Sequence, residues 1–139
     1  MRVAISVGSA YYDGENWDEL VEYVKTADRL GVDTVWSAEA WGMDAVASIG
    51  YLAAVTDRIT LGTGIMQISA RTPAATAMTA MSLAQISQDR FALGLGVSGP
   101  QVVEGLHGAA FANPLGRLRE YIDIVRICLL YTSPSPRDS

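Results

Sequence analysis

The chain has 139 residues, enough for one ordinary domain, and half of them are hydrophobic, as in globular rather than disordered proteins. Ten basic residues stand against fifteen acidic ones, for a formal net charge of −5, and no Lys/Arg cluster predicts a nucleic-acid surface. One Cys and one His exclude an internal disulfide and give too few ligands for a zinc site. The apolar run at the amino terminus is too short for a signal peptide or a bilayer span, so we expect a cytoplasmic protein without a membrane segment.

The first half of the chain contains two strand–helix units. A β-branched run predicts a strand over residues 2–8, and apolar residues spaced three and four apart predict a helix over residues 17–30 that ends at Gly31. The same alternation predicts a second strand over residues 33–37 and an alanine-rich helix over residues 44–56.

Two further units follow. A third strand is predicted over residues 58–65, and Thr72 is the expected N-cap of a helix over residues 73–87 that begins with proline. A fourth strand is predicted over residues 90–97. After a loop with one short helical turn, apolar residues at threes and fours predict a fourth helix over residues 114–129.

The predicted strands are apolar on both faces, which is typical of parallel strands covered by helices. Two α/β architectures fit this βαβαβαβα pattern, an open doubly wound sheet and part of a TIM (β/α)8 barrel. Small and polar residues at three strand ends favour the barrel, since ligands bind at the carboxyl end of its strands. These residues are Gly8 with Ser9, residues 62–64 and residues 94–99.

A formal G-x-G-x-x-G match at Gly94, Gly96 and Gly99 offers an alternative, a Rossmann-type nucleotide-binding module. That fingerprint belongs after the first strand of a domain, whereas this match follows the fourth. Its first two glycines also lie inside the predicted strand, where glycine allows close backbone approach. The context therefore favours a packing role.

Three other features admit both a structural and a functional interpretation. Gly62 and Gly64 interrupt a β-branched strand; the structural interpretation is a bulge, and the functional one is that they make room for a flat ligand. Glu39 lies near Trp41 after the second strand. It is either a functional residue, an acid/base group or a cofactor anchor, or a solvated loop glutamate. His107 is the single histidine, and a structural role is the commoner one for such a residue.

Four segments in this order resemble the amino-terminal half of luciferase-like flavin oxidoreductases, and most closely the branch that uses the deazaflavin coenzyme F420. The resemblance covers about residues 2–126. The segments are VWSAEAWGMDA, RITLGTGIMQISARTPAATAMTAMSLAQIS, DRFALGLGVSGPQVVEGLHG and PLGRLREYIDIVR. It implies the N-terminal four βα units of a TIM barrel, with parallel strands.

The resemblance also implies an activity and a cofactor. The activity is hydride transfer between coenzyme F420 and a small-molecule organic substrate, or oxygen-dependent monooxygenation with FMN as the alternative cofactor. The full-length form is expected to be a homo-oligomer. Relatives often carry a non-proline cis peptide at the end of the third strand, a position that falls here on Gly64–Ile65.

Residue by residue, the resemblance implies a cofactor site at the strand ends. Its cofactor-binding members are Glu39, Gly64, Ile65, Met66, Gln67, Ser98 and Gly99. Glu39 matches an acidic position near the cofactor ring and is the candidate for an acid/base role. His107, in the segment EGLHG, is a second catalytic candidate to which the resemblance gives no firm role. No metal ligand is expected.

The carboxyl end departs from the family pattern. We expect residues 1–127 to form the truncated barrel domain and residues 128–139 to be a non-native or disordered tail that resembles spurious ends on translated gene fragments. Strands five to eight are absent, so we expect the chain alone to bind cofactor weakly or not at all. A non-catalytic half-barrel that assembles with a copy of itself is a further alternative, because two parallel sheet edges are left open.

Overall fold

The computed structural model describes residues 1–8 and 17–132. The predicted tail straddles this limit. Residues 128–132 continue the last helix, and residues 133–139, like Ser9, lie outside the described residues.

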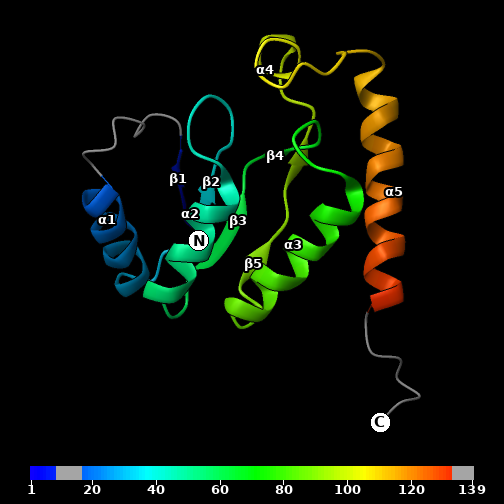
Figure 1. Cartoon of the computed structure of the whole chain (residues 1–139). Helices are drawn as coiled ribbons and strands as arrows, with labels where there is room; N and C mark the ends of the chain where they lie inside the picture. Colours follow the sequence, from blue (N-terminus) through cyan, green and yellow to red (C-terminus); the bar gives the residue numbers. More distant parts are fainter. Residues whose placement is uncertain (9–16, 133–139) are drawn as a thin grey trace.

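The strands form a parallel sheet whose spatial order follows the chain. It contains β1 (Ala4–Val7), β2 (Thr34–Ser37), β3 (Thr60–Thr63) and β5 (Phe91–Ala92), in the order β1-β2-β3-β5 (Figure 1). A doubly wound sheet reverses its strand order at a switch point, and this sheet does not. The predicted barrel-type sheet is therefore confirmed, and the doubly wound alternative is wrong.

The fourth predicted strand is divided in two, whereas the third, predicted over residues 58–65, spans only Thr60–Thr63 and is followed by a separate short strand. Beyond the main sheet, β4 (Met66–Gln67) pairs in parallel with β6 (Leu95–Gly96). Between the two sheets the Thr63 hydroxyl donates to the Gly94 carbonyl oxygen and accepts from the Gly94 N–H, both at 2.8 Å. The Gly94 carbonyl oxygen also accepts from the Met66 N–H at 2.8 Å, so the Thr63 side chain replaces a ladder partner for the Gly94 N–H alone.

The four long helices lie on one face of the sheet, α1 (Trp17–Arg29), α2 (Ala45–Val55), α3 (Pro73–Ile86) and α5 (Pro114–Thr132). The short α4 (Pro100–Val103) lies beyond the carboxyl ends of the strands (Figure 1). The long helices contact one another in chain order, α1 with α2, α2 with α3 and α3 with α5 (Figure 1). Helices that alternated between two faces could not do so, which again excludes the Rossmann-type module.

The core lies between the sheet and these helices. Val35 and Leu61 point into it and are almost fully buried with Val24, Ile49 and Leu52. Since strand side chains alternate between faces, their neighbours Trp36 and Gly62 point to the opposite face, which would be the barrel interior. The glycine and threonine at the helix ends act as predicted: Gly31 has φ +79°, and the Thr72 hydroxyl accepts from the Ala75 N–H.

Arg90, which precedes β5, ties helix α2 to the sheet. Its guanidinium donates to the carbonyl oxygens of Ala53 and Thr56 at the end of α2, and to those of Ile59 and Ser87. The last carbonyls of a helix have no partner within the helix, and they carry the negative end of its dipole. A planar cation with several N–H donors satisfies them from one position.

Candidate functional site

The link between β3 and β4 contains a cis peptide bond at Gly64–Ile65, as predicted. Gly64 is exposed and Ile65 is partly exposed, whereas Met66 and Gln67 are buried. Of the four predicted cofactor-lining residues in this stretch, the first two therefore present atoms at the surface. The other two are covered by the protein itself.

The glycines near this link make room for protein atoms. A Cβ on Gly62 would lie 2.3 Å from the Trp36 ring, so the indole occupies the space over this glycine. A Cβ on Gly94 would lie 2.1 Å from the Thr63 carbonyl oxygen, and one on Gly96 would lie 2.9 Å from the Ile65 side chain. The close-approach interpretation of Gly94 and Gly96 is confirmed. The room at Gly62 is filled by Trp36, which packs on the interior-facing side of the sheet and not against the helices.

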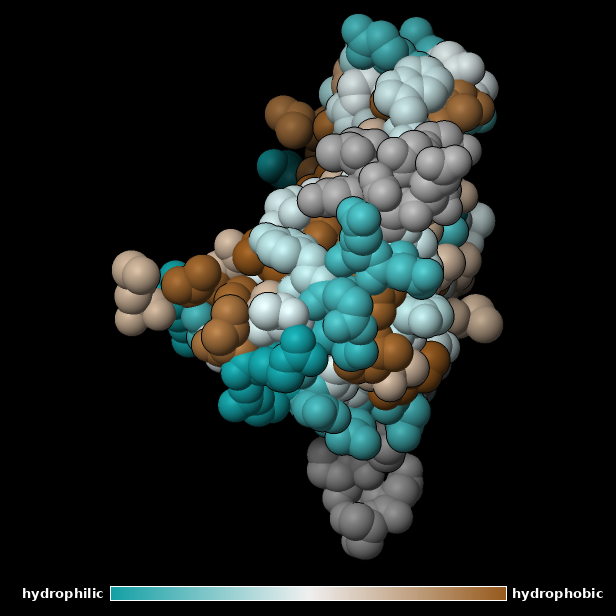
Figure 2. All heavy atoms as spheres, turned by 90° about the vertical axis from the view of Figure 1, so that its left-hand side faces the viewer, coloured by the Kyte–Doolittle hydropathy of each residue, from teal (hydrophilic) through white to brown (hydrophobic). Residues whose placement is uncertain are grey.

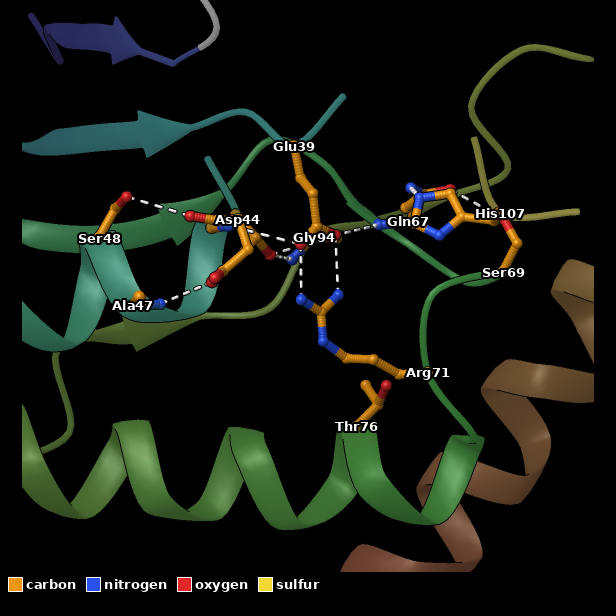
Figure 3. Close-up of polar contacts among 12 residues, drawn as sticks. Glu39, Asp44, Ala47, Ser48, Gln67, Ser69, Arg71, Thr76, Gly94 and His107 are labelled. Atoms are coloured by element: carbon orange, nitrogen blue, oxygen red, sulfur yellow. Dashed lines mark hydrogen bonds and ion pairs between the residues drawn. The ribbon is translucent and has the colours of Figure 1, made fainter. Parts of the chain in front are cut away.

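Glu39 forms a buried ion pair that the sequence did not reveal. It is 8% exposed, and its two carboxylate oxygens accept from the Arg71 guanidinium at 2.5 and 2.7 Å (Figure 3). The same oxygens accept from the backbone N–H of Gln67 at 3.1 Å and of Ala45 at 3.4 Å. Ala45 begins α2, so the carboxylate also lies at the positive end of that helix.

These partners determine the ionisation of Glu39. Burial raises the pKa of the carboxyl group, but the hydrogen bonds and charge of Arg71, together with the two backbone N–H groups, lower it by more. The net pKa lies below the ordinary value, so the group is a carboxylate at neutral pH. The Glu39 carboxylate in turn raises the pKa of Arg71.

Gln67 links Glu39 to His107, through its backbone N–H on one side and its side-chain amide on the other. Gln67 is 1% exposed, its backbone N–H reaches Glu39, and its Oε1 accepts from the Ser69 hydroxyl at 2.8 Å. Its Nε2 lies 2.5 Å from Nε2 of His107 (Figure 3). The structure thus brings three predicted site residues, Glu39, Gln67 and His107, into one hydrogen-bonded chain.

Ser98 and Gly99 lead into α4. Ser98 has φ 58°, a left-handed conformation that is uncommon for a residue other than glycine, and Gly99 is the N-cap of α4. The carbonyl oxygen of Gly99 accepts from the N–H groups of Val102 and Val103. The turn after α4 contains His107, which contacts Gln67 of β4. Ser98 and Gly99 therefore lie on a segment that is attached to Gln67 through this contact.

Sequence reasoning missed Arg71 and Tyr121. The Tyr121 hydroxyl, from α5, donates to the Arg71 carbonyl oxygen at 3.0 Å and contacts the Thr76 hydroxyl at 2.5 Å. Burial is the main cause that raises the pKa of Tyr121. The sequence does show an arginine, Arg71, directly before the N-cap of a helix. No local pattern indicates that its partner is Glu39.

Among the described residues, no cluster of His, Cys, Asp and Glu could hold a metal ion. Within the same residues, no helix combines the length and apolar character needed to cross a bilayer.

Comparison with known proteins gives a consistent result. The pattern of the family described as "Luciferase-like monooxygenase" matches residues 2–135. A Mycobacterium tuberculosis protein, provisionally named a coenzyme F420-dependent oxidoreductase, is 47% identical over 134 residues, which are 96% of this chain and 38% of that protein. The 5,10-methylenetetrahydromethanopterin reductase of Methanolobus tindarius is 34% identical over 78% of this chain and 33% of its own length. The chain thus spans about two fifths or less of these relatives.

Solved structures match the fold. The monooxygenase RslO1 from Streptomyces bottropensis superposes with a TM-score of 0.81 at 23% identity, over 91% of this chain and 42% of that one. The coenzyme F420-dependent tetrahydromethanopterin reductase from Methanopyrus kandleri gives a TM-score of 0.76 at 20% identity, over 89% and 39%.

Proposed function

We propose, from the premise that this chain belongs to the luciferase-like monooxygenase family, that it forms the cofactor-ring side of a coenzyme F420-dependent oxidoreductase. The observation that carries the proposal is the exposed backbone of Gly64 at the carboxyl end of the strands. Hydride transfer to or from a small organic substrate is the proposed reaction, and monooxygenation with FMN is the second candidate. F420 is placed first because the 47% identical relative carries that cofactor in its name.

The residues present fit a planar ring. Gly64 is exposed and has no side chain, and its neighbour Ile65 is partly exposed. Trp36, on the adjacent strand, is also partly exposed. The nearby charges of Glu39 and Arg71 neutralise each other. We therefore propose that Gly64 and Ile65 would hold the ring, which when bound would accept or donate the hydride.

Glu39 is proposed as a positioning residue. Its carboxylate joins the loop after β2, the start of α2, strand β4 and the segment before α3 through four hydrogen bonds. A general acid must carry a proton near neutral pH, and the lowered pKa of Glu39 opposes this. We infer that Glu39 acts on the ring by fixing the backbone of Gln67.

The cofactor proposal predicts two titration results. Isothermal titration of the 139-residue chain with F420 or FMN should show weak binding or none, because the chain spans about two fifths of its relatives and an incomplete barrel leaves the ring open to water. Grafting residues 1–127 in place of the matching segment of the M. tuberculosis relative should restore binding, tighter for F420 than for FMN.

In that graft, Gly64→Leu should weaken F420 binding at least about tenfold, since a side chain would stand where the ring is proposed to lie. The first added atom would lie 3.2 Å from the Trp36 Cβ, a tight contact that requires Trp36 to shift by a few tenths of an ångström. The control is Ala47→Leu, which places the same leucine side chain on the exposed surface of α2. Equal affinities in both variants contradict the proposed ring position.

We further propose a homo-oligomer that forms through α2 and α3. Neither helix contains Asp, Glu, Lys or Arg, whereas six of the 13 residues of α1 are charged. Hydrophilic spheres accordingly cover much of the α1 side (Figure 2). An apolar groove of about 510 Å³ between α2 and α3 is lined by small residues, with Met78 and Ile86 of α3 65% and 55% exposed. Two such uncharged faces can meet without like-charge repulsion.

Met78→Glu should therefore raise the dissociation constant of the dimer more than about tenfold, because a charge would be buried in an apolar interface. Sedimentation over a range of concentrations measures this, with Tyr23→Glu on α1 as the control, at a similarly exposed position. Self-association that Met78→Glu leaves unchanged would favour the alternative assembly through open sheet edges.

A further inference from the structure

His107 carries a ring nitrogen whose role is set by its neighbour. Ser69 donates its hydroxyl proton to Oε1 of Gln67 at 2.8 Å, which turns Nε2 of the same amide toward the histidine. With the amide in this orientation its nitrogen can only donate, and Nε2 of His107, 2.5 Å away, is the acceptor. An accepting ring nitrogen carries no proton, so in this tautomer the proton is on Nδ1.

The burial of Gln67 protects its hydrogen bond to His107 from water. Gln67 is 1% exposed, so water does not compete for its amide, and its backbone is fixed by Glu39. His107 is exposed, on the turn whose backbone N–H bonds to the Val102 carbonyl oxygen. Gln67 therefore contacts Nε2 of the ring (Figure 3), while the histidine as a whole is exposed.

We propose that Ser69 and Gln67 hold His107 as the neutral Nδ1–H tautomer, and that this N–H is a hydrogen-bond donor to an oxygen of a ligand bound at the strand ends. Gln67 and Ser69 are positioning residues in this scheme, since they act through the histidine. The ligand part of the inference rests on the proposed function. The tautomer part requires no ligand.

The tautomer can be read directly, because His107 is the single histidine of the chain. The 15N shifts of the two ring nitrogens should show a pyrrole-type Nδ1 and a pyridine-type Nε2, with at least roughly a fivefold excess of this tautomer. Equal populations, or an excess of the Nε2–H form, would overturn the assignment.

Three variants and a control test the cause. Gln67→Glu replaces the donor by a carboxylate that only accepts, and should move the proton of the ring to Nε2. Ser69→Ala leaves Gln67 in place but removes the hydroxyl that orients its amide, so the excess of the Nδ1–H tautomer should fall at least about threefold. Ser69→Thr keeps a hydroxyl and should restore that excess. Ser82→Ala, an exposed position on α3, is the control. A tautomer ratio unchanged by Ser69→Ala overturns the proposed orientation.

Titration of the graft, which is expected to bind F420, tests the donor role by NMR, with the His107 signals identified by their loss in the graft that carries His107→Gln. The Nδ1 resonance should shift while the tautomer stays the same. If other resonances near Gly64 shift and Nδ1 does not, the donor role is wrong and the proposed function stands. If no resonance shifts, the cofactor proposal fails as well, whereas the tautomer measurement is unaffected.

Discussion

Replacing Arg71 by Ala is expected to lower the free energy of unfolding by about 3–5 kcal/mol, because it leaves the Glu39 carboxylate buried without its cation. Glu39 is 8% exposed and receives two of its four hydrogen bonds from Arg71. The two backbone N–H groups that remain cannot compensate for the charge. Urea unfolding followed by circular dichroism at pH 7 measures the loss.

The double variant Glu39→Gln with Arg71→Met is the matched control, since removing both charges of a buried pair costs far less than removing one. It should lie within about 2 kcal/mol of the wild type. A loss below about 1 kcal/mol for Arg71→Ala alone would mean that water reaches the pair, as it does in surface ion pairs.

The cost of Arg71→Ala should depend on pH. The folded pKa of Glu39 lies below its ordinary value of 4.5, so the stabilisation from ionised Glu39 is present above pH 4.5 and is lost as the pH falls through the folded pKa. The difference between wild type and Arg71→Ala is therefore expected to be full at pH 7 and smaller at pH 3. A difference that grows at pH 3 would contradict the assigned charge state.

Arg90→Ala is expected to lower the free energy of unfolding by about 2–4 kcal/mol, because four carbonyl oxygens lose a charged donor together. Its partners come from the end of α2, the start of β3 and the end of α3. Partial exposure of the site lets water replace some of these bonds, which keeps the loss below the sum of its parts.

Two variants make this result specific to Arg90. Arg90→Lys keeps the charge but not the planar fork, and should recover less than half of the loss. Arg126→Ala removes an arginine whose side chain is 74% exposed, and should change stability by less than about 0.5 kcal/mol. Equal effects of Arg90→Ala and Arg126→Ala would show that the carbonyls of α2 are satisfied by solvent.

The elements and their order could be predicted because their causes are local. Hydrophobic period, the Thr72 cap and Gly31 are all encoded within a few residues of where they act, and the structure places each as expected. Strands apolar on both faces indicated a parallel sheet, and family resemblance located the cis peptide at Gly64–Ile65.

The candidate site depended on contacts between residues far apart in the sequence. The partner of Glu39 is 32 residues away, that of Gln67 is 40 residues away, and Trp36 fills the space over Gly62 from a neighbouring strand. Such pairs are set by strand register and loop path, which no local pattern encodes. By itself, therefore, the sequence determined a parallel barrel-type scaffold with an acidic residue and a histidine near its strand ends. Only the tertiary structure decided that Arg71 holds the acid as a carboxylate and that buried Gln67 joins it to His107.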